Sequence, residues 1–548
     1  MSSLAKAISL ALLMGTAGTA AAVDNGGPID RALSAIRANP TATRLSTSDA
    51  FTSRGVTVRN GTEHVRFART YKGLPVIGGD LVVHSRAGAF KSASLTQAKP
   101  LGLSTTPTIT SSMAITNAGV QFGTAFDAAP TAHLAVYART ATPRLVYDVL
   151  YVGAAKDKTP IRMHYSVDAL TGAVIEKRNA VQTGTLPGTG YDTGTPSTPP
   201  VVTPATGSGR SIMAGSVPLN TQWNATRRVF EMKDTTRGNT YITDMGNGWR
   251  SNGTLFADTD NKWGNGFATD RASAAVDAAY GFAKTWDFYK AKFGRLGIRG
   301  DNVGAFGAVH YQLNYGNAFW SEDCFCMAFG DGDGTVLKPL VAIDIMGHEM
   351  THGVTNVTAD LIYSKESGGL NEATSDILGT MVEYYANNAL QPPNYFIGDS
   401  IFVVPGSGYI RSMFKPSMDG ISDDCFPNGS DPNYVTFFKN SKDPHYTSGV
   451  ANHFFYLLAE GAVVPSGQMV PANLTPNDLV CNGNVGLAGI GREAATQIWY
   501  LALTAYFTSS TDYSAARVAT LSAATDLYGA GSANYNAVAA AWDAVNVH

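Results

Sequence analysis

The run from His348 to His352, with the pattern H-E-x-x-H, restricts the possible folds of this chain more than any other feature. It lies in a stretch, residues 340–355, whose pattern predicts a helix. Residues four apart point from the same face of a helix, so both imidazoles would be directed at one point. Two neutral imidazoles so placed can bind one zinc ion, and Glu349 can reach a water molecule beside it. A nearby element must then supply the third ligand.

The motif is rare by chance, because the chain has ten histidines among 548 residues. At that frequency about 0.01 such motifs are expected in a chain of this length. The alternative interpretation is a solvent-exposed helix with two unrelated histidines. The residues that follow the motif decide between the two interpretations, because they offer a third ligand.

A second predicted helix begins about twenty residues after the motif and carries two acidic residues, Glu372 and Asp376. The two residues are four apart, so they share one face of this helix. Glu372 can bind the metal, while Asp376 can accept a hydrogen bond from a ligand histidine and fix its orientation. An exposed acidic edge is the ordinary interpretation of such a pair. The short distance from the histidine helix favours the metal site instead.

Five segments together form a specific pattern: Gly347–Val354, Gly369–Asp376, Tyr315–Trp320, Gly330–Gly334 and Asp443–Val450. With these segments the chain resembles, over nearly its whole length, the thermolysin family of zinc endopeptidases. The resemblance implies an α+β fold in which an α+β propeptide precedes a two-lobed catalytic domain. One lobe would be β-rich and N-terminal, the other α-helical and C-terminal. It also implies a secreted zinc endopeptidase that is made as a self-processing zymogen.

The resemblance assigns roles to individual residues near the motif. His348, His352 and Glu372 would bind one zinc ion. Glu349 would take a proton from water and later deliver it to the leaving amine. The other assignments are Tyr363 and His445 for stabilising the tetrahedral intermediate, Asp376 and Asn371 for orienting the ligand histidines, and Asp443 for keeping His445 charged.

By the same resemblance, the substrate would lie extended along an edge strand that bears Asn317 and Ala318, and bond to it through backbone groups. Arg411 would bind the substrate backbone beyond the cut bond. An apolar pocket for the residue after that bond would favour leucine, phenylalanine or a similar side chain. The residues expected to line this pocket are Ile345, Ile397, Ile401 and Ile410.

A structural calcium site is also implied by the resemblance. Its expected ligands are Asp344, Glu383 and Asp399. Phe396 stands where thermolysin has a further carboxylate, and Asn394 replaces an expected aspartate. The double calcium site should therefore be reduced to one ion.

The first 22 residues have the features of a secretory signal peptide. Lys6 supplies a positive charge, residues 8–14 form a short apolar core, and Ala20 to Ala22 offer small residues for cleavage. No later run reaches 18 apolar residues, so we expect no membrane-spanning segment in the mature protein. The sequence thus predicts a secreted, extracellular protein.

The expected domains follow changes in composition and pattern. Strand-like runs occur at residues 64–76 and 81–84, with a turn at Gly78 to Asp80 between them. Apolar residues at helical spacing from Ala274 to Trp286 predict one long helix. The expected boundaries are 23–205 for the propeptide, with a fungalysin/thermolysin propeptide segment at about 50–97, a PepSY-like module at about 112–182 and an exposed Thr/Gly/Pro-rich linker at about 183–205, then 206–343 for the β-rich lobe and 344–548 for the helical lobe.

Four cysteines, Cys324, Cys326, Cys425 and Cys481, suggest disulfides in an exported protein. Four cysteines allow three pairings. A bond between Cys324 and Cys326 would close a very small ring, and a bond between Cys425 and Cys481 is also possible. The sequence leaves the pairing open. Compared with thermolysin, two extra residues around Cys324 lie near the substrate strand and affect the subsites before the cut bond.

The charge composition limits the kinds of molecule that this protein is expected to bind. The net charge is −3 and the sequence pI is about 6.4, so nothing suggests binding to nucleic acid or to an anionic membrane. We expect a monomer whose partners are protein and peptide substrates and its own propeptide, acting as folding helper and inhibitor. Two other functions stay open: an exported binding protein with a vestigial metal site, and another zinc amidohydrolase.

Overall fold

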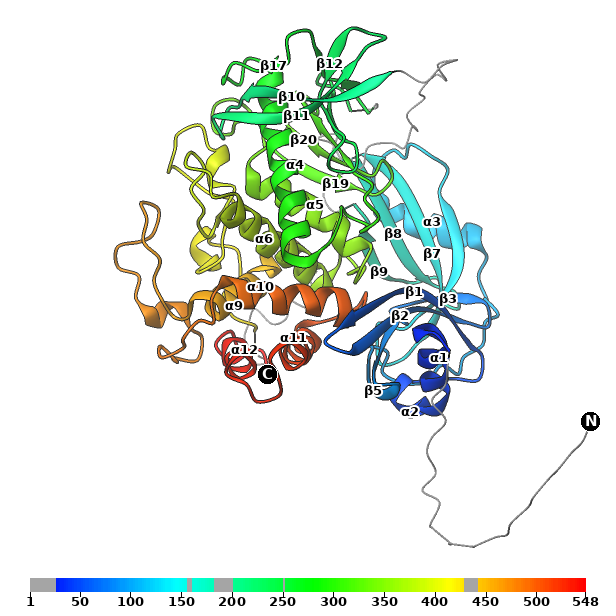
Figure 1. Cartoon of the computed structure of the whole chain (residues 1–548). Coiled ribbons are helices and arrows are strands. Elements are labelled where there is room, and N and C mark those ends of the chain that lie inside the picture. The colour runs from blue at the N-terminus through cyan, green and yellow to red at the C-terminus, as the bar shows by residue number, and fades with distance from the viewer. Residues whose placement is uncertain (1–25, 155–159, 182–200, 250–251, 428–441) are drawn as a thin grey trace, which may run out of the picture.

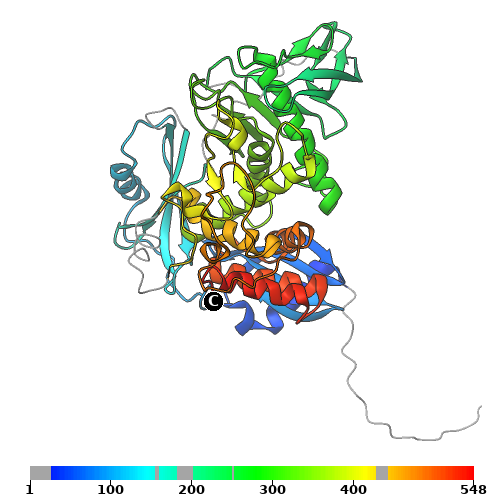
Figure 2. The same cartoon turned by 90° about the vertical axis from the view of Figure 1, so that its left-hand side faces the viewer.

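The computed structural model describes residues 26–154, 160–181, 201–249, 252–427 and 442–548. The expected signal peptide, residues 1–22, and most of the expected linker lie outside these ranges. The N-terminal part, blue and cyan in Figures 1 and 2, lies along one side of the rest of the chain. Within the described ranges, no helix is both long and apolar enough to cross a membrane.

The N-terminal part is built on one nine-stranded sheet with the order β5-β4-β2-β3-β6-β7-β8-β9, in which β1 also pairs with β2. Its two halves are joined by the parallel pairing of β3 with β6, where Val76 lies opposite Val136. The two expected propeptide modules therefore share a continuous sheet. The strands are β1 Asp49–Arg59, β2 Thr62–Tyr71, β3 Leu74–Ile77, β4 Leu81–Arg86, β5 Ala89–Ser94, β6 Thr131–Tyr137, β7 Arg144–Ala154, β8 Pro160–Asp168 and β9 Val174–Asn179.

Helices cover this sheet through small apolar clusters. Helix α1 (Pro28–Ala38) places Ala32 and Ile36 against the apolar face of β2 and β4, and the short helix α2 (Pro40–Thr43) follows it. Helix α3 (Ser111–Phe122) packs on β7 and β8 in the second half. Buried and partly buried residues alternate along most of β2 and β7, which leaves one face of each strand for these helices.

The run predicted as one strand at residues 64–76 is two strands in the structure. A turn at Lys72 and Gly73, both with positive φ (48° and 81°), separates β2 from β3. Glycine adopts that conformation without cost, so Gly73 permits the tight reversal. The predicted turn at Gly78 to Asp80 is present, and Gly78 has a φ of 74°.

The next part of the chain forms two further sheets, at the top of Figure 1. The first has the order β16-β12-β11-β10-β17, and the second has the order β13-β14-β18-β20-β19 with β15 paired to β14. Strand β19 therefore lies at a sheet edge. The strands are β10 Val202–Arg210, β11 Ser216–Asn224, β12 Val229–Glu231, β13 Lys233–Asp234, β14 Thr240–Asp244, β15 Thr254–Leu255, β16 Ala257–Asp258, β17 Lys262–Trp263, β18 Phe306–Val309, β19 Ala318–Ser321 and β20 Cys326–Phe329.

Helices dominate the rest, as expected for an α+β fold with a β-rich first lobe and a helical second lobe. The long helix predicted around Ala274 to Trp286 is α4, and the histidine helix begins at Ile343 rather than at residue 340. The elements are α4 Arg271–Phe293, α5 Ile343–Asn356, α6 Lys365–Ala386, β21 Phe396–Ile397, η1 Asp399–Ile401, β22 Arg411–Ser412, η2 Pro416–Asp419, α8 Pro444–Thr447, α9 Gly449–Glu460, η3 Pro476–Leu479, α10 Arg492–Leu501, η4 Ala502–Tyr506, α11 Tyr513–Tyr528 and α12 Ala533–Asp543.

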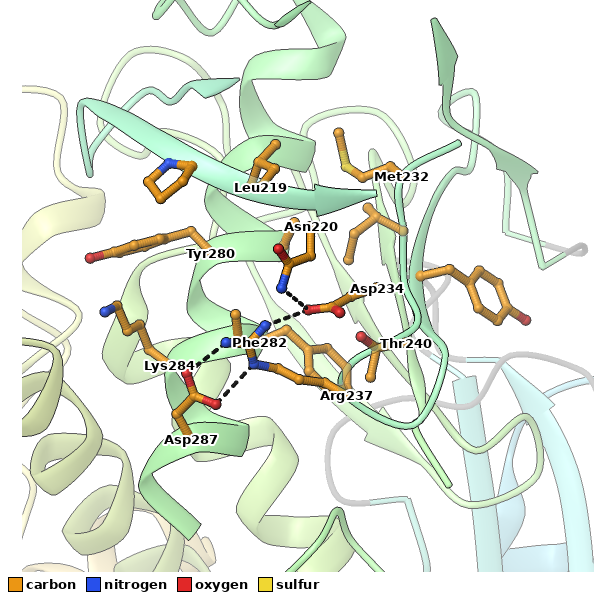
Figure 3. Close-up of a pocket in the computed structure, with 15 residues that line it drawn as sticks. Leu219, Asn220, Met232, Asp234, Arg237, Thr240, Tyr280, Phe282, Lys284 and Asp287 are labelled. Atoms are coloured by element: carbon orange, nitrogen blue, oxygen red, sulfur yellow. Dashed lines mark hydrogen bonds and ion pairs between the residues drawn. The ribbon is translucent and has the colours of Figure 1, made fainter. Parts of the chain in front are cut away.

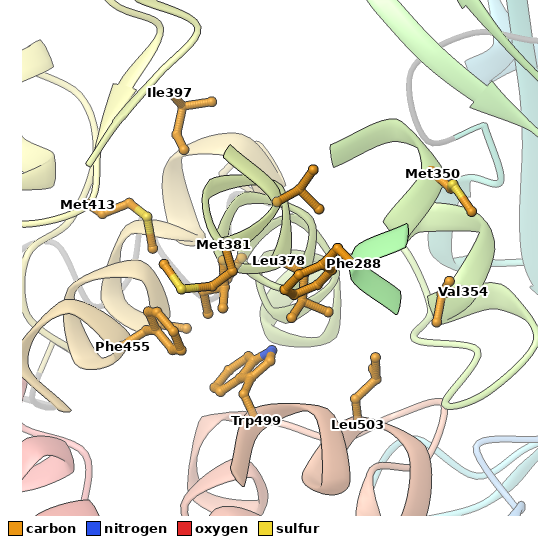
Figure 4. Close-up of a cluster of buried hydrophobic side chains, with 14 of the residues drawn as sticks. Phe288, Met350, Val354, Leu378, Met381, Ile397, Met413, Phe455, Trp499 and Leu503 are labelled. Carbon is orange, nitrogen blue, oxygen red and sulfur yellow. The ribbon is translucent and has the colours of Figure 1, made fainter. Parts of the chain in front are cut away.

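Helix α6 is the centre of the helical lobe, and every residue from Ser367 to Glu383 is buried. Its apolar side chains Leu378 and Met381 lie between Phe288 of α4, Phe455 of α9 and Trp499 of α10 (Figure 4). Because the helix is enclosed on all sides, its polar residues are buried as well. They must therefore bind one another or a ligand, since an unpaired buried polar group is costly.

Two glycines allow α5 and α6 to approach closely. A Cβ atom on Gly347 would lie 2.9 Å from the Cα of Gly379, and a Cβ atom on Gly379 would lie 2.6 Å from the Asp344 carbonyl oxygen. Any side chain at either position would push the helices apart. This contact places the histidines of α5 opposite the acidic residues of α6.

Two disulfides are present, Cys324–Cys326 and Cys425–Cys481. The sequence alone did not determine how the four cysteines pair, and the structure shows these two pairs. The first lies at the turn of the hairpin formed by β19 and β20. The second joins two segments of the helical lobe that are 56 residues apart.

Candidate active site

The two histidines of the motif face one point. Both lie on α5, and their Nε2 atoms are 3.0 Å apart. His348 is 5% exposed and His352 is 0% exposed. With both Nδ1 atoms engaged elsewhere, the two Nε2 atoms are the pair available to a metal ion.

Glu372 on α6 completes the group. Its two carboxylate oxygens lie 3.5 Å from the Nε2 of His348 and 3.4 Å from that of His352. Tetrahedral zinc with ligands at about 2.0–2.1 Å places neighbouring ligand atoms about 3.3 Å apart. The Oε2 atom of Glu372 is buried without a hydrogen-bond partner. The three side chains therefore fit zinc by spacing, by donor type and by an unsatisfied buried oxygen.

The ligand atoms of His348, Glu349 and His352 also lie within 4.8 Å of one another, so Glu349 is a second possible third ligand. The pKa values of Glu349 and Glu372 indicate which of the two carboxylates is the better metal ligand. Burial raises the pKa of Glu349 to about 7. Burial also opposes the ionisation of Glu372, but the histidines His445, His352 and His348 outweigh it and lower its pKa to about 2. Glu372 thus suits a permanent anionic ligand, while Glu349 suits proton transfer near neutral pH.

The other ring nitrogens of the histidines are held by residues of α6. The Nδ1 of His348 lies 2.9 Å from Asp376 Oδ1, and the Nδ1 of His352 lies 2.8 Å from Asn371 Oδ1. These are the two orienting residues expected from the sequence. Such bonds fix which nitrogen faces the metal.

Asp376 is itself held by two side chains. Arg411 on β22 donates to both of its oxygens, at 2.8 and 2.6 Å, and Asn452 on α9 donates to Oδ2 at 2.8 Å. Burial opposes its ionisation, but the Arg411 guanidinium and His348 outweigh burial and hold the pKa of Asp376 well below its ordinary value. Asp376 is therefore a fixed anion behind the metal site.

Tyr363 and His445 lie on the other side of Glu372. The Tyr363 hydroxyl donates to Glu372 Oε1 at 2.6 Å, and His445 Nε2 lies 3.4 Å from Glu372 Oε2. Asp443 Oδ1 is 2.6 Å from His445 Nδ1. Burial disfavours the charged ring, but Glu372 and Asp443 outweigh it and raise the pKa of His445. The two donors are thus grouped where the sequence analysis expected them.

The residues expected to bind substrate divide into two groups. Asn317 and Ala318 lie at the start of the edge strand β19, where a peptide could add to the sheet. Arg411 is only 10% exposed, and its Nε and Nη2 atoms donate to Asp376. This contact was not predicted from the sequence. Its Nη2 lies 3.9 Å from Glu372 Oε2, so the guanidinium borders the site. Contact with a substrate stays a prediction.

Three of the four isoleucines meet around Gly398. A Cβ atom at Gly398 would lie 2.7 Å from Ile410 Cδ1 and 3.4 Å from Ile345 Cδ1, and the Ile410 amide donates to the Ile397 carbonyl at 2.7 Å. Ile401 is fully buried. Ile345, Ile397 and Ile410 thus form one apolar group, and their role as a pocket stays a prediction.

Of the acidic residues expected to bind calcium, Asp344 and Glu383 are buried and Asp399 is half-buried. The Asp344 carboxylate accepts a bond from the Gly398 amide at 2.6 Å, and the Glu383 carboxylate accepts one from the Asn394 amide at 3.3 Å. Glu383 Oε1 and Asp399 Oδ1 are buried without hydrogen-bond partners. Burial, with Asp399 next, raises the pKa of Asp344 to about 6, and burial and the two aspartates raise that of Glu383 further above its ordinary value.

A cavity of about 170 Å³ between β11 and α4 is remote from this chemistry. Figure 3 shows Arg237 paired with two aspartates of the lining: it donates to Asp234 and to Asp287, at 2.5 and 2.7 Å. The other basic residue of the lining, Lys284, lies over the ring of Tyr280.

Asn452 was not predicted from the sequence. A signal for it was available, because Asn452 is a polar residue within α9, whose other residues are mostly apolar. A buried amide in such a helix needs a partner, and here the partner is Asp376.

Comparisons with known proteins agree with this geometry. The model "Thermolysin metallopeptidase, catalytic domain" matches residues 206–356, and "Thermolysin metallopeptidase, alpha-helical domain" matches 359–547. The "Fungalysin/Thermolysin Propeptide Motif" matches residues 52–96. A solved structure, the precursor of protealysin from Serratia proteamaculans, is 26% identical over 56% of this chain and 87% of its own, with a TM-score of 0.42, too low to bear on the fold.

Curated relatives span most of this chain. The transglutaminase-activating metalloprotease of Streptomyces mobaraensis is 43% identical over 89% of this chain, which spans 60% of that protein's length. Thermolysin of Bacillus sp. (strain EA1) is 33% identical over 88% of this chain and 83% of its own. Bacillolysin of Bacillus cereus is 34% identical over 88% and 82%. Because two family models match residues 206–356 and 359–547, and because relatives 33–34% identical span more than 80% of both chains, the chain belongs to the thermolysin family of metallopeptidases.

Proposed function

We propose that the chain is the zymogen of a secreted zinc endopeptidase that hydrolyses internal peptide bonds before large apolar residues. The observation that carries this proposal is the set of distances from the Glu372 carboxylate to His348 and His352, 3.5 and 3.4 Å, with Glu349 beside them. When zinc is bound there, it supplies Lewis acidity that makes water easier to deprotonate and polarises the carbonyl.

The side chains around the zinc ligands perform the remaining chemistry. Glu349, with its pKa near 7, takes a proton from the attacking water and delivers it to the leaving nitrogen. The Tyr363 hydroxyl and protonated His445 donate to the oxygen on which negative charge develops. Asp376 keeps His348 oriented, since Arg411 and Asn452 fix its carboxylate. A protein that only bound metal would not need the donors Tyr363 and His445.

The proposal is tested with Glu349→Gln. We expect the variant to bind one zinc per chain and to lose casein hydrolysis by a factor of about 10³ or more, since general acid–base groups contribute about 10²–10⁴-fold. Glu493→Gln, on the exposed part of α10, is the matched control and should keep full activity. Turnover of Glu349→Gln at the control's rate would end the proposal.

The N-terminal part supports a role as inhibitor and folding helper. Arg139 donates to Ser367 at 2.9 Å, and Glu176 lies 3.6 Å from Lys365. These contacts hold the start of α6, directly after Tyr363. In addition, Arg162 lies 2.6 Å from Asp323, in the hairpin beside the substrate strand β19. The propeptide thus touches both borders of the proposed substrate site.

We also propose one calcium ion between Asp344, Glu383 and Asp399. Burial is the main cause of the raised pKa of all three carboxylates, and neighbouring carboxylates add to it at Asp344 and Glu383. A divalent cation removes that cost of burying charged groups. We expect a calcium-selective chelator to lower the melting temperature while zinc stays bound. An unchanged melting curve in the chelator would contradict the calcium site.

A further inference from the structure

A second cavity, of about 360 Å³, lies between the propeptide and the catalytic part of the chain. Strands β1 and β2 form one wall, and the chain after α4 together with α10 forms the other. None of the residues that line it is one of the zinc-site residues named above. No aspartate or glutamate is among the residues that line it, but five arginines are: Arg54, Arg59 and Arg66 from the propeptide, and Arg295 and Arg299 from the catalytic part.

The arginines around this cavity have mainly neutral partners. Arg59 reaches Gln497 at 3.5 Å, and Arg295 donates to the Ile298 carbonyl at 3.0 Å and lies 3.4 Å from the Tyr500 hydroxyl. The Arg299 guanidinium lies 3.9 Å from the ring centre of Phe325. In the described part of the chain, none of these three has a carboxylate oxygen at ion-pair distance. Their charge is therefore not neutralised by the protein.

Two polar groups that line the cavity are buried without hydrogen-bond partners. Both terminal nitrogens of Arg66 are unpartnered, and its side chain is 11% exposed. The Nε2 of His64 is unpartnered as well, and its side chain is 0% exposed. Arg66 Nη1 lies 3.9 Å from an oxygen of Asp80, and His64 Nε2 lies 3.5 Å from an oxygen of Asp526. The Arg66 nitrogens are donors, and buried donors of this kind are normally satisfied by a ligand or by water.

Asp80 and Asp360 favour the charged form of Arg66, and several of the carboxylates near the cavity also bind other groups. Asp80 accepts a bond from the Ser509 amide at 2.9 Å. Asp526 lies 2.8 Å from Lys91 and accepts a bond from Tyr506 at 2.5 Å. Glu493, on α10, lies 2.5 Å from Lys292. Arg54 and Arg59 of the propeptide thus share the lining of one cavity with Arg295 and Arg299 of the catalytic part. Like charges so placed weaken the association of the two parts unless a counter-charge lies between them.

We propose that this cavity is a binding site for a small multivalent oxyanion of the sulfate or phosphate class, which bridges the propeptide to the catalytic part. The planar guanidinium fork matches two oxygens of such an anion, and arginines from both walls could each use one fork. The anion neutralises the facing charges and satisfies the buried donors. Because the walls belong to two parts, the site exists only while the propeptide is in place, so the anion stabilises the zymogen selectively.

The test uses the full chain with Glu349→Gln, which keeps the propeptide attached, and sulfate as the probe, since phosphate would also bind calcium. We expect millimolar sodium sulfate to raise the melting temperature saturably by about 1–3 °C over sodium chloride of equal ionic strength. Isothermal titration should give one sulfate site per chain.

Two double variants separate site binding from the general effect of sulfate on protein stability. Arg59→Gln with Arg299→Gln removes one arginine from each wall, and we expect it to lose the sulfate response. Arg86→Gln with Arg228→Gln removes two exposed arginines outside the cavity, one from each part, and should keep the response. An equal sulfate response in both double variants, or titration heats without saturation in the parent chain, would overturn the proposal.

Discussion

Asn452 influences the zinc site without touching it. Its amide donates to Asp376 Oδ2 at 2.8 Å, and Asp376 Oδ1 lies 2.9 Å from His348 Nδ1. Arg411 binds both oxygens of the same carboxylate. Arg411 and Asn452 together fix the Asp376 carboxylate, and the carboxylate in turn fixes the orientation of the His348 imidazole.

We predict that Asn452→Ala lowers zinc affinity by about 10–100-fold, the range typical for residues that orient a metal ligand. Competition with a zinc chelator measures this directly, and activity at saturating zinc should recover most of the loss. Asn536→Ala, at an exposed position on α12, is the control. If both variants hold zinc equally, Asn452 has only a packing role.

The sequence predicts the residues of this site better than it predicts their neighbours. His348, His352 and Glu372 follow from helical spacing and a short connection, which are local properties. Arg411 makes two hydrogen bonds to Asp376, which is 35 positions away in the sequence, and no local sequence pattern predicts this contact. Asn452 is 76 positions from its partner. Contacts of this range depend on how the helices assemble.

At the scale of the elements, the close approach of α5 and α6 sets the geometry of the metal ligands. The contact depends on the absence of side chains at Gly347 and Gly379. The two helices carry the ligands on their facing sides, so a small increase in helix separation moves His348 away from Glu372.

We predict that Gly379→Ala lowers stability by about 1–3 kcal/mol, the usual cost of an extra methyl group in a packed core. It should also weaken zinc binding, because the new Cβ would lie 2.9 Å from the His348 backbone nitrogen. Denaturant unfolding and zinc competition measure the two effects. Gly486→Ala, where the Cβ would be 3.7 Å from its nearest neighbour, should change neither. Normal zinc affinity in Gly379→Ala would show that the helices can adjust.

The two disulfides should differ in their contribution to stability. Loop-closure entropy gives about 4 kcal/mol for a bond across 56 residues and about 1 kcal/mol for one across two. We therefore predict a larger loss of stability for the Cys425→Ser/Cys481→Ser double variant than for Cys324→Ser/Cys326→Ser. Thermal unfolding of both variants gives the comparison. The reverse order would mean that the short bond orders the hairpin beside β19 for reasons other than chain entropy.

Element types were predicted more accurately than element ends. The long helix α4 and the two helices of the site were expected, but α5 begins three residues later than predicted. The split of residues 64–76 into β2 and β3 was missed because the run is uniformly strand-like, while the reversal depends on Lys72 accepting a positive φ. Pairing of β3 with β6 across the two propeptide halves has no local sequence signal.

At the scale of the whole molecule, a pair of histidines joins the propeptide to the helical lobe. The Nδ1 atoms of His64 and His84 lie 2.8 Å apart, so one ring must lack a proton there. The Tyr506 ring stacks on His84 and contacts His64. The charged groups around the pair are Asp526, Lys91 and Arg66. Burial, opposed in part by Asp526, lowers the pKa of His64 to about 4, and burial also lowers that of His84.

We predict that acid weakens the attachment of the propeptide. A histidine in the detached propeptide takes up a proton near pH 6.5, whereas His64 in the intact interface does so only near pH 4. The interface is therefore fully stable above about pH 6.5 and loses stability as the pH falls toward 4, by about 3 kcal/mol for His64 alone. Melting of the uncut full chain across this pH range measures the effect.

A matched pair of variants isolates the histidine contribution. His64→Gln should flatten the pH dependence between 6.5 and 4, while His133→Gln, exposed on β6, should leave it unchanged. If the slope survives in His64→Gln, buried carboxylates rather than this pair govern the acid response.

Strand β10 restricts where the finished enzyme can begin. It starts at Val202, and its first four residues form a ladder with β11 in which Val202 lies opposite Asn224. The expected boundary between residues 205 and 206 falls inside this strand. Cleavage there would remove four of the nine residue pairs between β10 and β11, so a stable product should retain the strand whole and carry its new amino terminus upstream of Val202.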